Sequence, residues 1–140
     1  MKLSRRYVLM LSSASVAATA MGAIPAFASL TEDEIAKLTG GADMAEGGVT
    51  LTAPEIAENG NTVPIEVSAP GAVAITLFAD GNPVPNVATF NFGPLSASRA
   101  ASTRIRLAGT QNVIAIAKME DGSFQKASAN VKVTIGGCGG

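Results

Sequence analysis

The sequence contains no histidine, no tryptophan and a single cysteine among its 140 residues. The lack of histidine excludes a Ser-His-Asp triad, a Cys-His pair and any histidine-ligated metal site. A single cysteine excludes an intrachain disulfide and a zinc site built from several thiolates. These nucleophilic and metal-based arrangements are therefore not available to the chain.

Charge is also scarce. Charged residues make up 15% of the chain, with ten Lys and Arg against eleven Asp and Glu. A nucleic-acid-binding domain normally carries a basic excess clustered on one face, so this balance argues against nucleic acid as a partner. Fifteen glycines and seven prolines in a chain with so little charge favour many turns and short strands over long helices.

The first 28 residues have the pattern of an export signal and are expected to lie outside the fold. Arg5 and Arg6 precede an apolar stretch rich in Ala and Ser, and Ala26-Phe27-Ala28 offers a small-x-small cleavage site. The stretch is short for a membrane-spanning helix. Two adjacent arginines before a soft apolar region resemble the twin-arginine signal, which exports folded proteins to the periplasm. The alternative is an ordinary secretory signal.

Cleavage after Ala28 would leave a mature domain of 112 of the 140 residues. The loss of Lys2, Arg5 and Arg6 leaves seven basic against eleven acidic residues. A small, mildly acidic, exported domain of this kind has no concentration of positive charge for phosphate or anionic lipid. No membrane association is expected once the signal is removed.

A short helix is predicted over residues 30–41. Thr31 and Glu34 fit a capping box, and Leu30 and Ile35 take the positions of a hydrophobic staple. Gly40 is a natural stop. The acidic residues at 32–34 are explained by the favourable interaction of negative charge with the start of a helix, rather than by a metal site.

From residue 49 onward, apolar and polar residues alternate with a period of two. About seven short strands are predicted, at 49–52, 63–68, 72–77, 90–92, 103–107, 113–117 and 131–135. The run Val113–Ala117 is apolar at every position, as expected of a strand buried on both faces. Turn signals such as Asp80-Gly81-Asn82-Pro83 separate the runs, and Asp121-Gly122 is a two-residue hairpin signal. The pattern predicts one all-β domain over 29–135, an antiparallel β-sandwich.

Three arginines follow the middle of this pattern. Arg104 and Arg106 are expected on the same face of a strand, opposite Ile105, with Arg99 nearby. We interpret them as a solvated outer face, with an anion- or partner-docking face as the alternative.

Two further pairs have weaker signals. Glu55 and Glu58 are expected in a polar loop, because nothing near them in the sequence supplies a nucleophile or a metal ligand. Phe90 and Phe92 share one face of a strand, where core packing is the first interpretation and a partner interface the second.

The chain ends in a tail of a different kind, residues 136–140. Gly136, Gly137, Gly139 and Gly140 surround the only thiol, that of Cys138. Because glycine lacks a Cβ, these residues impose little conformational preference and no steric cover. The tail is therefore expected to be a flexible tether that starts from a rigid strand.

Several uses of the thiol compete. A bare thiol in an oxidising compartment forms an intermolecular disulfide easily, and such a bond would staple a dimer. A prenylation signal needs three residues after the cysteine, and only two follow Cys138. The remaining interpretation is a covalent carrier arm that presents an intermediate to other proteins. No histidine adjoins Cys138 and a terminal tail offers no helix dipole, so we expect partner enzymes to activate the thiol.

The last ten residues, Val131–Gly140, resemble the carboxy-terminal signature of the SoxY family of sulfur carriers. The stretches Arg104–Leu107, Val113–Met119 and Asp121–Phe124 resemble the same family, and so does the twin-arginine leader. The resemblance covers the mature chain, and its most specific part is the Gly-Gly-Cys-Gly-Gly end.

The resemblance implies an immunoglobulin-like sandwich that pairs with a second β-sandwich protein, SoxZ, which lacks a leader. It also implies that Cys138 is loaded covalently with thiosulfate. A haem enzyme, SoxAX, makes a cysteine S-thiosulfonate by oxidative coupling, and a hydrolase, SoxB, releases sulfate. The remaining sulfane sulfur is oxidised by a sulfane dehydrogenase or passed to another acceptor.

The chain is thus expected to be a periplasmic carrier acted on by partner enzymes, not an enzyme. No metal and no cofactor are expected apart from the sulfur intermediates bound to Cys138. The alternative is an exported immunoglobulin-like interaction module that dimerises through a disulfide at Cys138.

Overall fold

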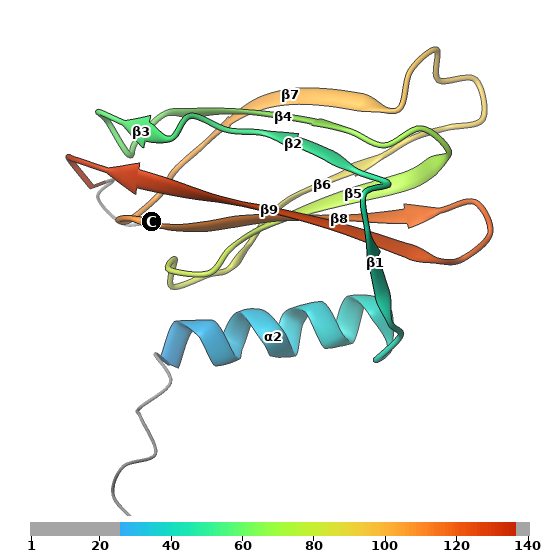
Figure 1. Ribbon diagram of the computed structural model, residues 1–140, viewed down its shortest axis with the longest axis horizontal. Helices are drawn as coiled ribbons and strands as arrows, with labels where there is room; N and C mark the ends of the chain where they lie inside the picture. The colour runs from blue at the N-terminus through green and yellow to red at the C-terminus, as the bar shows by residue number, and fades with distance from the viewer. Residues whose placement is uncertain (1–25, 137–140) are drawn as a thin grey trace, which may run out of the picture.

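A computed structural model describes residues 26–136 of the chain. Within these residues, helix α2 (Ala26–Thr39) is followed by a series of mostly short strands (Figure 1). The strands are β1 (Met44–Glu46), β2 (Thr50–Thr52), β3 (Ile56–Ala57), β4 (Val63–Ser68), β5 (Ala72–Ala79), β6 (Asn86–Asn91), β7 (Ala100–Ile105), β8 (Gln111–Met119) and β9 (Phe124–Val133).

The strands form two facing sheets. One has the order β1-β9-β8-β5-β6, with β3 also paired to β9, and the other has the order β2-β4-β7. The helix covers the face of the larger sheet that points away from the smaller one (Figure 1). The predicted immunoglobulin-like β-sandwich with a short amino-terminal helix is therefore confirmed.

Alternating side chains fill the space between the sheets. Val63, Ile65 and Val67 of β4 are buried, and they belong to the same apolar cluster as Ile75 and Leu77 of β5. The cluster continues through alternate residues of β8, namely Val113, Ala115 and Ala117. The period of two seen in the sequence thus reports which face of each strand is turned to the other sheet.

A second, smaller cluster lies between the larger sheet and α2. Ile35 of the helix packs with Phe78 of β5, Ile116 of β8 and Phe124 of β9. Because β8 contributes Ile116 to this cluster and its neighbours to the sandwich core, the predicted burial of β8 on both faces is confirmed.

The predicted start of the helix is wrong. The helix begins at Ala26, so Thr31 lies within it, is buried, and does not occupy the capping position. Leu30 is 44% exposed and takes no part in the smaller cluster, which also excludes the predicted staple. The residues before Thr31 are compatible with a helix, so the helix begins before Thr31 rather than at it. Thr31 and Ile35 are one helical turn apart, and both are buried against the sheet. The cleavage site after Ala28 stays a prediction.

Two short strands were not predicted, and both pair in parallel with β9. Strand β1 pairs with its first half and β3 with its end, while the other strand pairs are antiparallel. Strand β9 is continuous over ten residues and ends at Val133 rather than at 135. Its polar middle pairs with β8 through the backbone, which requires no apolar alternation.

The hairpin predicted at Asp121-Gly122 joins β8 to β9, and the hydrogen-bonded pair of Met119 and Ser123 encloses three loop residues rather than two. The N–H of Met119 donates to the carbonyl of Ser123 (2.8 Å), and the N–H of Gly122 donates to the carbonyl of Met119 (3.0 Å). Gly122 has a φ of 85°. A turn followed by a left-handed glycine is the common three-residue hairpin connection.

We expect Phe78→Ala to destabilise the domain by roughly 3–5 kcal/mol, because it empties a fully buried site between the sheet and the helix. Urea unfolding measures this change. The matched control is Leu95→Ala, at a side chain that is 97% exposed, where a change within about 0.5 kcal/mol is expected. Equal effects of the two substitutions would contradict the described packing.

The hairpin turn also generates a pH prediction. The hydroxyl of Ser123 (2.6 Å) and its backbone N–H (2.9 Å) donate to the carboxylate of Asp121 and lower the pKa of that group. Because the folded pKa lies below the unfolded one, the resulting stability is present above the unfolded pKa and is lost as pH falls through the folded pKa. Ser123→Ala should raise the NMR titration midpoint of Asp121, whereas Ser96→Ala should not. A midpoint that Ser123→Ala leaves unmoved would refute this assignment.

Candidate functional site

The structure follows the chain to Gly136, so Cys138, Gly137, Gly139 and Gly140 lie outside the described residues. The base of the tail, however, is described. Cys138 lies two positions after Gly136, and an extended backbone spans at most about 7 Å over that distance. The residues that hold Ile135 and Gly136 therefore determine where the tail begins.

Strand β3 holds the end of β9 through the backbone (Figure 1). The N–H of Lys132 donates to the carbonyl of Glu55 (2.9 Å), and the N–H of Thr134 donates to the carbonyl of Ala57 (3.1 Å). The hydroxyl of Thr134 donates to the carbonyl of Glu58 (3.1 Å). The segment of Glu55 and Glu58, predicted as a polar loop, thus contains a short strand. It acts through its carbonyl groups, while both carboxylates belong to exposed residues.

Gly60 connects the tail base to the loop after β7. Its N–H donates to the carbonyl of Ile135 (2.7 Å), and its carbonyl accepts from the N–H of Leu107 (2.7 Å). Gly60 is buried. Both of its backbone polar groups are used, so the last residue with a side chain before the tail is tied to the body of the domain.

The loop 106–110, between β7 and β8, makes the remaining contacts. The hydroxyl of Thr110 accepts from the N–H of Val133 (2.9 Å). A Cβ placed on Gly136 would lie 2.5 Å from the carbonyl oxygen of Ala108. The sequence predicted conformational freedom for Gly136, and the structure adds a steric requirement, because no side chain fits at this position.

The sequence did not indicate these residues as part of a site. Gly60, Ala108 and Thr110 lie in loops whose sequences carry no motif of a functional site. Their contacts with the tail base are made largely by backbone groups, which every residue type carries. The pairing of distant segments, rather than any motif, brings them together.

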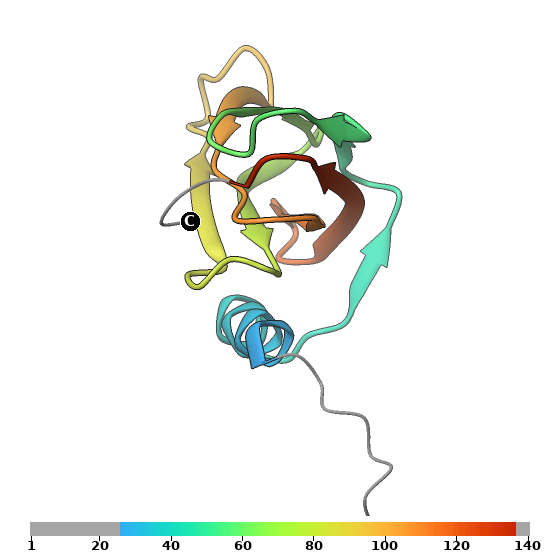
Figure 2. The same cartoon turned by 90° about the vertical axis from the view of Figure 1, so that its left-hand side faces the viewer.

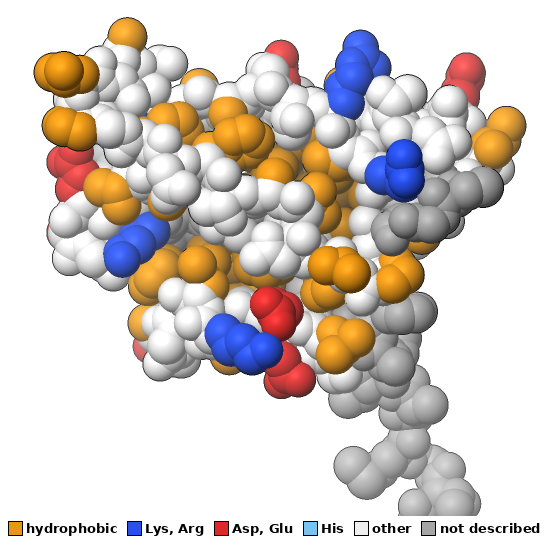
Figure 3. Space-filling view, turned by 180° about the vertical axis from the view of Figure 1, so that it is seen from behind, with side chains coloured by type: hydrophobic (Ala, Val, Ile, Leu, Met, Phe, Trp, Pro, Cys, Tyr) orange, Lys and Arg blue, Asp and Glu red, His pale blue; other side chains and the backbone are white. Residues whose placement is uncertain are grey.

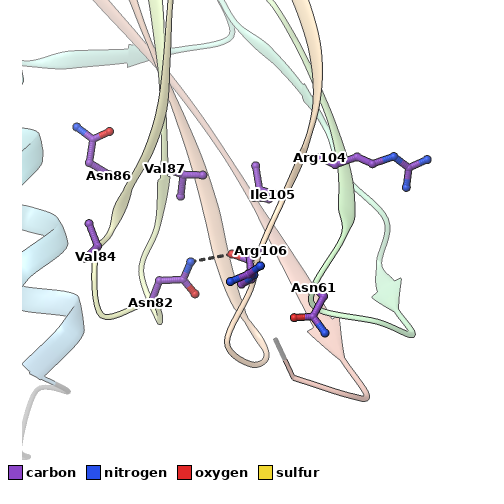
Figure 4. A pocket seen from close by; sticks show the side chains of 8 residues that line it. All are labelled: Asn61, Asn82, Val84, Asn86, Val87, Arg104, Ile105 and Arg106. Atoms are coloured by element: carbon purple, nitrogen blue, oxygen red, sulfur yellow. Dashed lines mark hydrogen bonds between the residues drawn. The ribbon is translucent and has the colours of Figure 1, made fainter. Parts of the chain in front are cut away.

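A hollow of about 380 Å³ opens beside this loop (Figure 4). Two residues that line the hollow adjoin residues that hold the tail base, because Asn61 follows Gly60 and Arg106 precedes Leu107. The hollow therefore lies next to the tail base. None of the described residues that line it is acidic. The lining residues are Asn61, Asn82, Val84, Asn86, Val87, Arg104, Ile105 and Arg106.

The three arginines noted in the sequence lie in two separate places. Arg104 and Arg106 are exposed and Ile105 is buried between them, which confirms the predicted alternation. Arg99 lies apart from them, where its guanidinium is 3.6 Å from the carboxylate of Glu120 in the β8–β9 turn. The three residues therefore do not form one continuous stripe.

Phe90 and Phe92 are half-buried and pack against the sandwich core, so their interpretation as core residues is confirmed. Within residues 26–136, no three of His, Cys, Asp and Glu lie together in a group suited to a metal ion. No helix of that same part of the chain is long and apolar enough to cross a membrane.

Gly136→Ala should loosen the tail base, because the new Cβ would collide with a backbone carbonyl that has little freedom to move. We expect faster hydrogen exchange of the Gly60 amide, which donates to Ile135. Gly109→Ala is the control, since a Cβ there meets nothing within 4 Å. Equal protection of the Gly60 amide in both variants would show that the close approach of Gly136 is unimportant.

The chain was compared with known proteins. Residues 35–138 match the family model described as "Sulfur oxidation protein SoxY". The structure is similar to that of the sulfur carrier protein SoxY from Chlorobium limicola f thiosulfatophilum, with 38% identity and a TM-score of 0.67, over 77% of this chain and 99% of that one. The comparison with curated protein sequences gave no significant match.

More distant similarities concern the fold alone. The superoxide reductase (neelaredoxin) from Ignicoccus hospitalis is 18% identical with a TM-score of 0.55, over 62% of this chain and 80% of that one. The hypothetical protein PH1083 from Pyrococcus horikoshii OT3 is 15% identical with a TM-score of 0.53, over 69% and 98%. The family model covers most of the chain and the SoxY structure is far more similar than these, so the chain belongs to the SoxY family of sulfur carrier proteins.

Proposed function

We propose that this protein is a periplasmic carrier in thiosulfate oxidation, in which Cys138 holds sulfur intermediates covalently and presents them to partner enzymes. The observation that carries the proposal is the contrast at the end of the chain. Backbone bonds tie Ile135 to the domain, and beyond it only glycines surround the single thiol. Membership of the SoxY family supports the carrier role.

The proposed cycle begins with an oxidative coupling. The Cys138 thiol and thiosulfate form one S–S bond, which releases a proton and two electrons, and a SoxAX-type haem enzyme takes up the electrons. A SoxB-type hydrolase then adds water across the bond between the outer sulfur and the sulfonate group. This step releases sulfate and a proton and leaves a persulfide on Cys138. A sulfane dehydrogenase takes six electrons from the outer sulfur, three waters supply the oxygens of the resulting sulfonate, and the hydrolase releases it as sulfate to regenerate the thiol. Alternatively, an acceptor thiolate takes the outer sulfur by exchange and leaves the Cys138 thiol free.

The tail base itself supplies no evident chemistry for these steps. Its contacts are made by backbone groups and by the hydroxyls of Thr110 and Thr134. Nothing among them acts as an oxidant or as a base for a thiol. We therefore assign activation of Cys138 to the partner enzymes, whose active sites a tail without large side chains can enter.

A SoxZ-type partner subunit is part of the proposal. Among the described residues 26–136, β6 pairs only with β5 and β7 only with β4, so each leaves one edge without a described partner. The two strands lie on the same side of the sandwich (Figure 2). The surface seen from behind carries a band of hydrophobic side chains with Lys and Arg scattered around it (Figure 3). Unpaired edges beside apolar surface suit a second β-sandwich.

Export by the twin-arginine route completes the proposal. Residues 1–25 of the leader lie outside the described residues, and the support for this route is the pattern around Arg5 and Arg6. That route carries folded proteins, which would allow a leaderless partner subunit to cross the membrane bound to this chain.

The test is mass spectrometry of the carboxy-terminal peptide after exposure of the protein to thiosulfate and the coupling enzyme. We expect reductant-sensitive additions of thiosulfate or sulfur on Cys138. Cys138→Ser should stay folded and lose all thiosulfate-dependent turnover in a reconstituted system, because hydroxyl oxygen does not form the S–S bond.

A relocated thiol is the matched control. The double variant Cys138→Ser, Leu95→Cys keeps one exposed thiol but removes it from the tail. Enzymatic loading of this variant, or turnover retained by Cys138→Ser alone, would reject the carrier function. A doubled mass that reductant halves, with no sulfur additions, would favour the disulfide-linked interaction module instead.

A further inference from the structure

Two buried polar side chains lie behind the loop that holds the tail base. Asn82, in the turn between β5 and β6, is 3% exposed, and Gln111, at the start of β8, is 5% exposed. Amide side chains are seldom buried to this extent unless they are fully hydrogen-bonded. Their partners therefore indicate what the two residues hold in place.

Asn82 bonds to two backbone groups of the loop and to Gln111. Its Nδ2 donates to the carbonyl of Arg106 (2.8 Å, Figure 4), and its Oδ1 accepts from the N–H of Ala108 (2.9 Å). The same Oδ1 accepts from Nε2 of Gln111 (3.0 Å). The side chain of Asn82 is thus hydrogen-bonded to the loop at both Arg106 and Ala108.

Gln111 completes the cluster. Its Nε2 also donates to the carbonyl of Gly109 (3.0 Å), and its Oε1 accepts from the N–H of Gly81 (2.8 Å). A Cβ on Gly81 would lie 2.9 Å from the Cβ of Gln111, so the turn before Asn82 packs closely on this side chain. The amide of Gln111 has little room to change its position.

The loop is therefore held on one side and holds the tail on the other. The N–H of Ala108 bonds to Asn82, while its carbonyl oxygen lies against Gly136. The neighbouring N–H of Leu107 bonds to Gly60, which in turn bonds to Ile135. A displacement of the loop would move the contacts of both residues from which the tail begins.

We propose that Asn82 and Gln111 are positioning residues for the carrier arm, an inference that rests on the carrier function proposed above. They set the point from which the tail begins by fixing loop 106–110. Because Cys138 is only two positions beyond Gly136, a displacement of the base shifts the point from which the thiol is presented.

The test compares enzymatic loading of Asn82 variants of the full chain. Asn82→Leu removes all three hydrogen bonds, and Asn82→Asp keeps the acceptor for Ala108 while losing the donor to Arg106. For Asn82→Leu we expect kcat/KM for loading by the coupling enzyme to fall about tenfold, through a higher KM for the carrier with little change in kcat. A misdirected arm enters the enzyme less often but reacts normally once inside. Asn82→Asp should recover most of this loss.

Two measurements separate positioning from a general loss of stability. Thr76→Val removes a partly buried side-chain hydrogen bond between β5 and β6, from Thr76 to Thr89 (3.3 Å), and should load like wild type. The reaction of Cys138 with a small disulfide reagent needs no defined direction of approach, so Asn82→Leu should leave its rate unchanged.

A wild-type KM for folded Asn82→Leu would overturn the inference, as would an equal rise in KM for Thr76→Val. Should Asn82→Leu fail to fold, Gln111→Glu decides, because it keeps the acceptor for Gly81 and loses both donated bonds. Faster hydrogen exchange at the Gly60 amide in that variant is expected, and unchanged exchange would overturn the inference. Failure of the wild-type chain to load at all would instead refute the carrier function.

Discussion

The position from which the carboxy-terminal tail begins depends on the backbone hydrogen bonds at the end of β9. A strand that left the sheet without partners there would fray, and the tail would begin at no defined place. Strand β3 and Gly60 prevent this by accepting and donating main-chain bonds as far as Ile135. Backbone groups supply a firm hold with no reactive side chain, which suits a site whose only chemistry is meant to come from one thiol.

The two apolar clusters explain why that end of β9 is a rigid support. The larger sheet packs on the smaller sheet with one face and on α2 with the other. Its central strands β5 and β8 are buried on both faces, and β9 is hydrogen-bonded along β8 over most of its length. The tail therefore follows a strand that is paired with β8 as far as Val131 and with β3 as far as Val133.

A carrier makes opposite demands on neighbouring residues. Gly136 lies so close to Ala108 that a side chain would not fit, while the glycines beyond it surround the thiol with the smallest residues available. The same amino acid thus meets a packing requirement at one position and, in the proposed function, a requirement for access at the next. In the interior, Asn82 and Gln111 hold the loop that contains Ala108 by hydrogen bonds. Such directional bonds specify one position of the loop more sharply than apolar packing would.

By itself the sequence determined the fold class, the strands of the core and the thiol that carries the proposed function. The alternation of apolar and polar residues with a period of two is a local property of the sequence, and the Gly-Gly-Cys-Gly-Gly end is recognised from the sequence alone. The start of the helix, the strands β1 and β3 and the hold on Ile135 and Gly136 were decided only by the tertiary structure. These features arise where segments far apart in the chain, such as Gly60, Asn82 and Ala108, meet through main-chain groups and buried amides. Nearly every residue carries the same main-chain groups, so no pattern of side chains in the sequence predicts these contacts between distant segments.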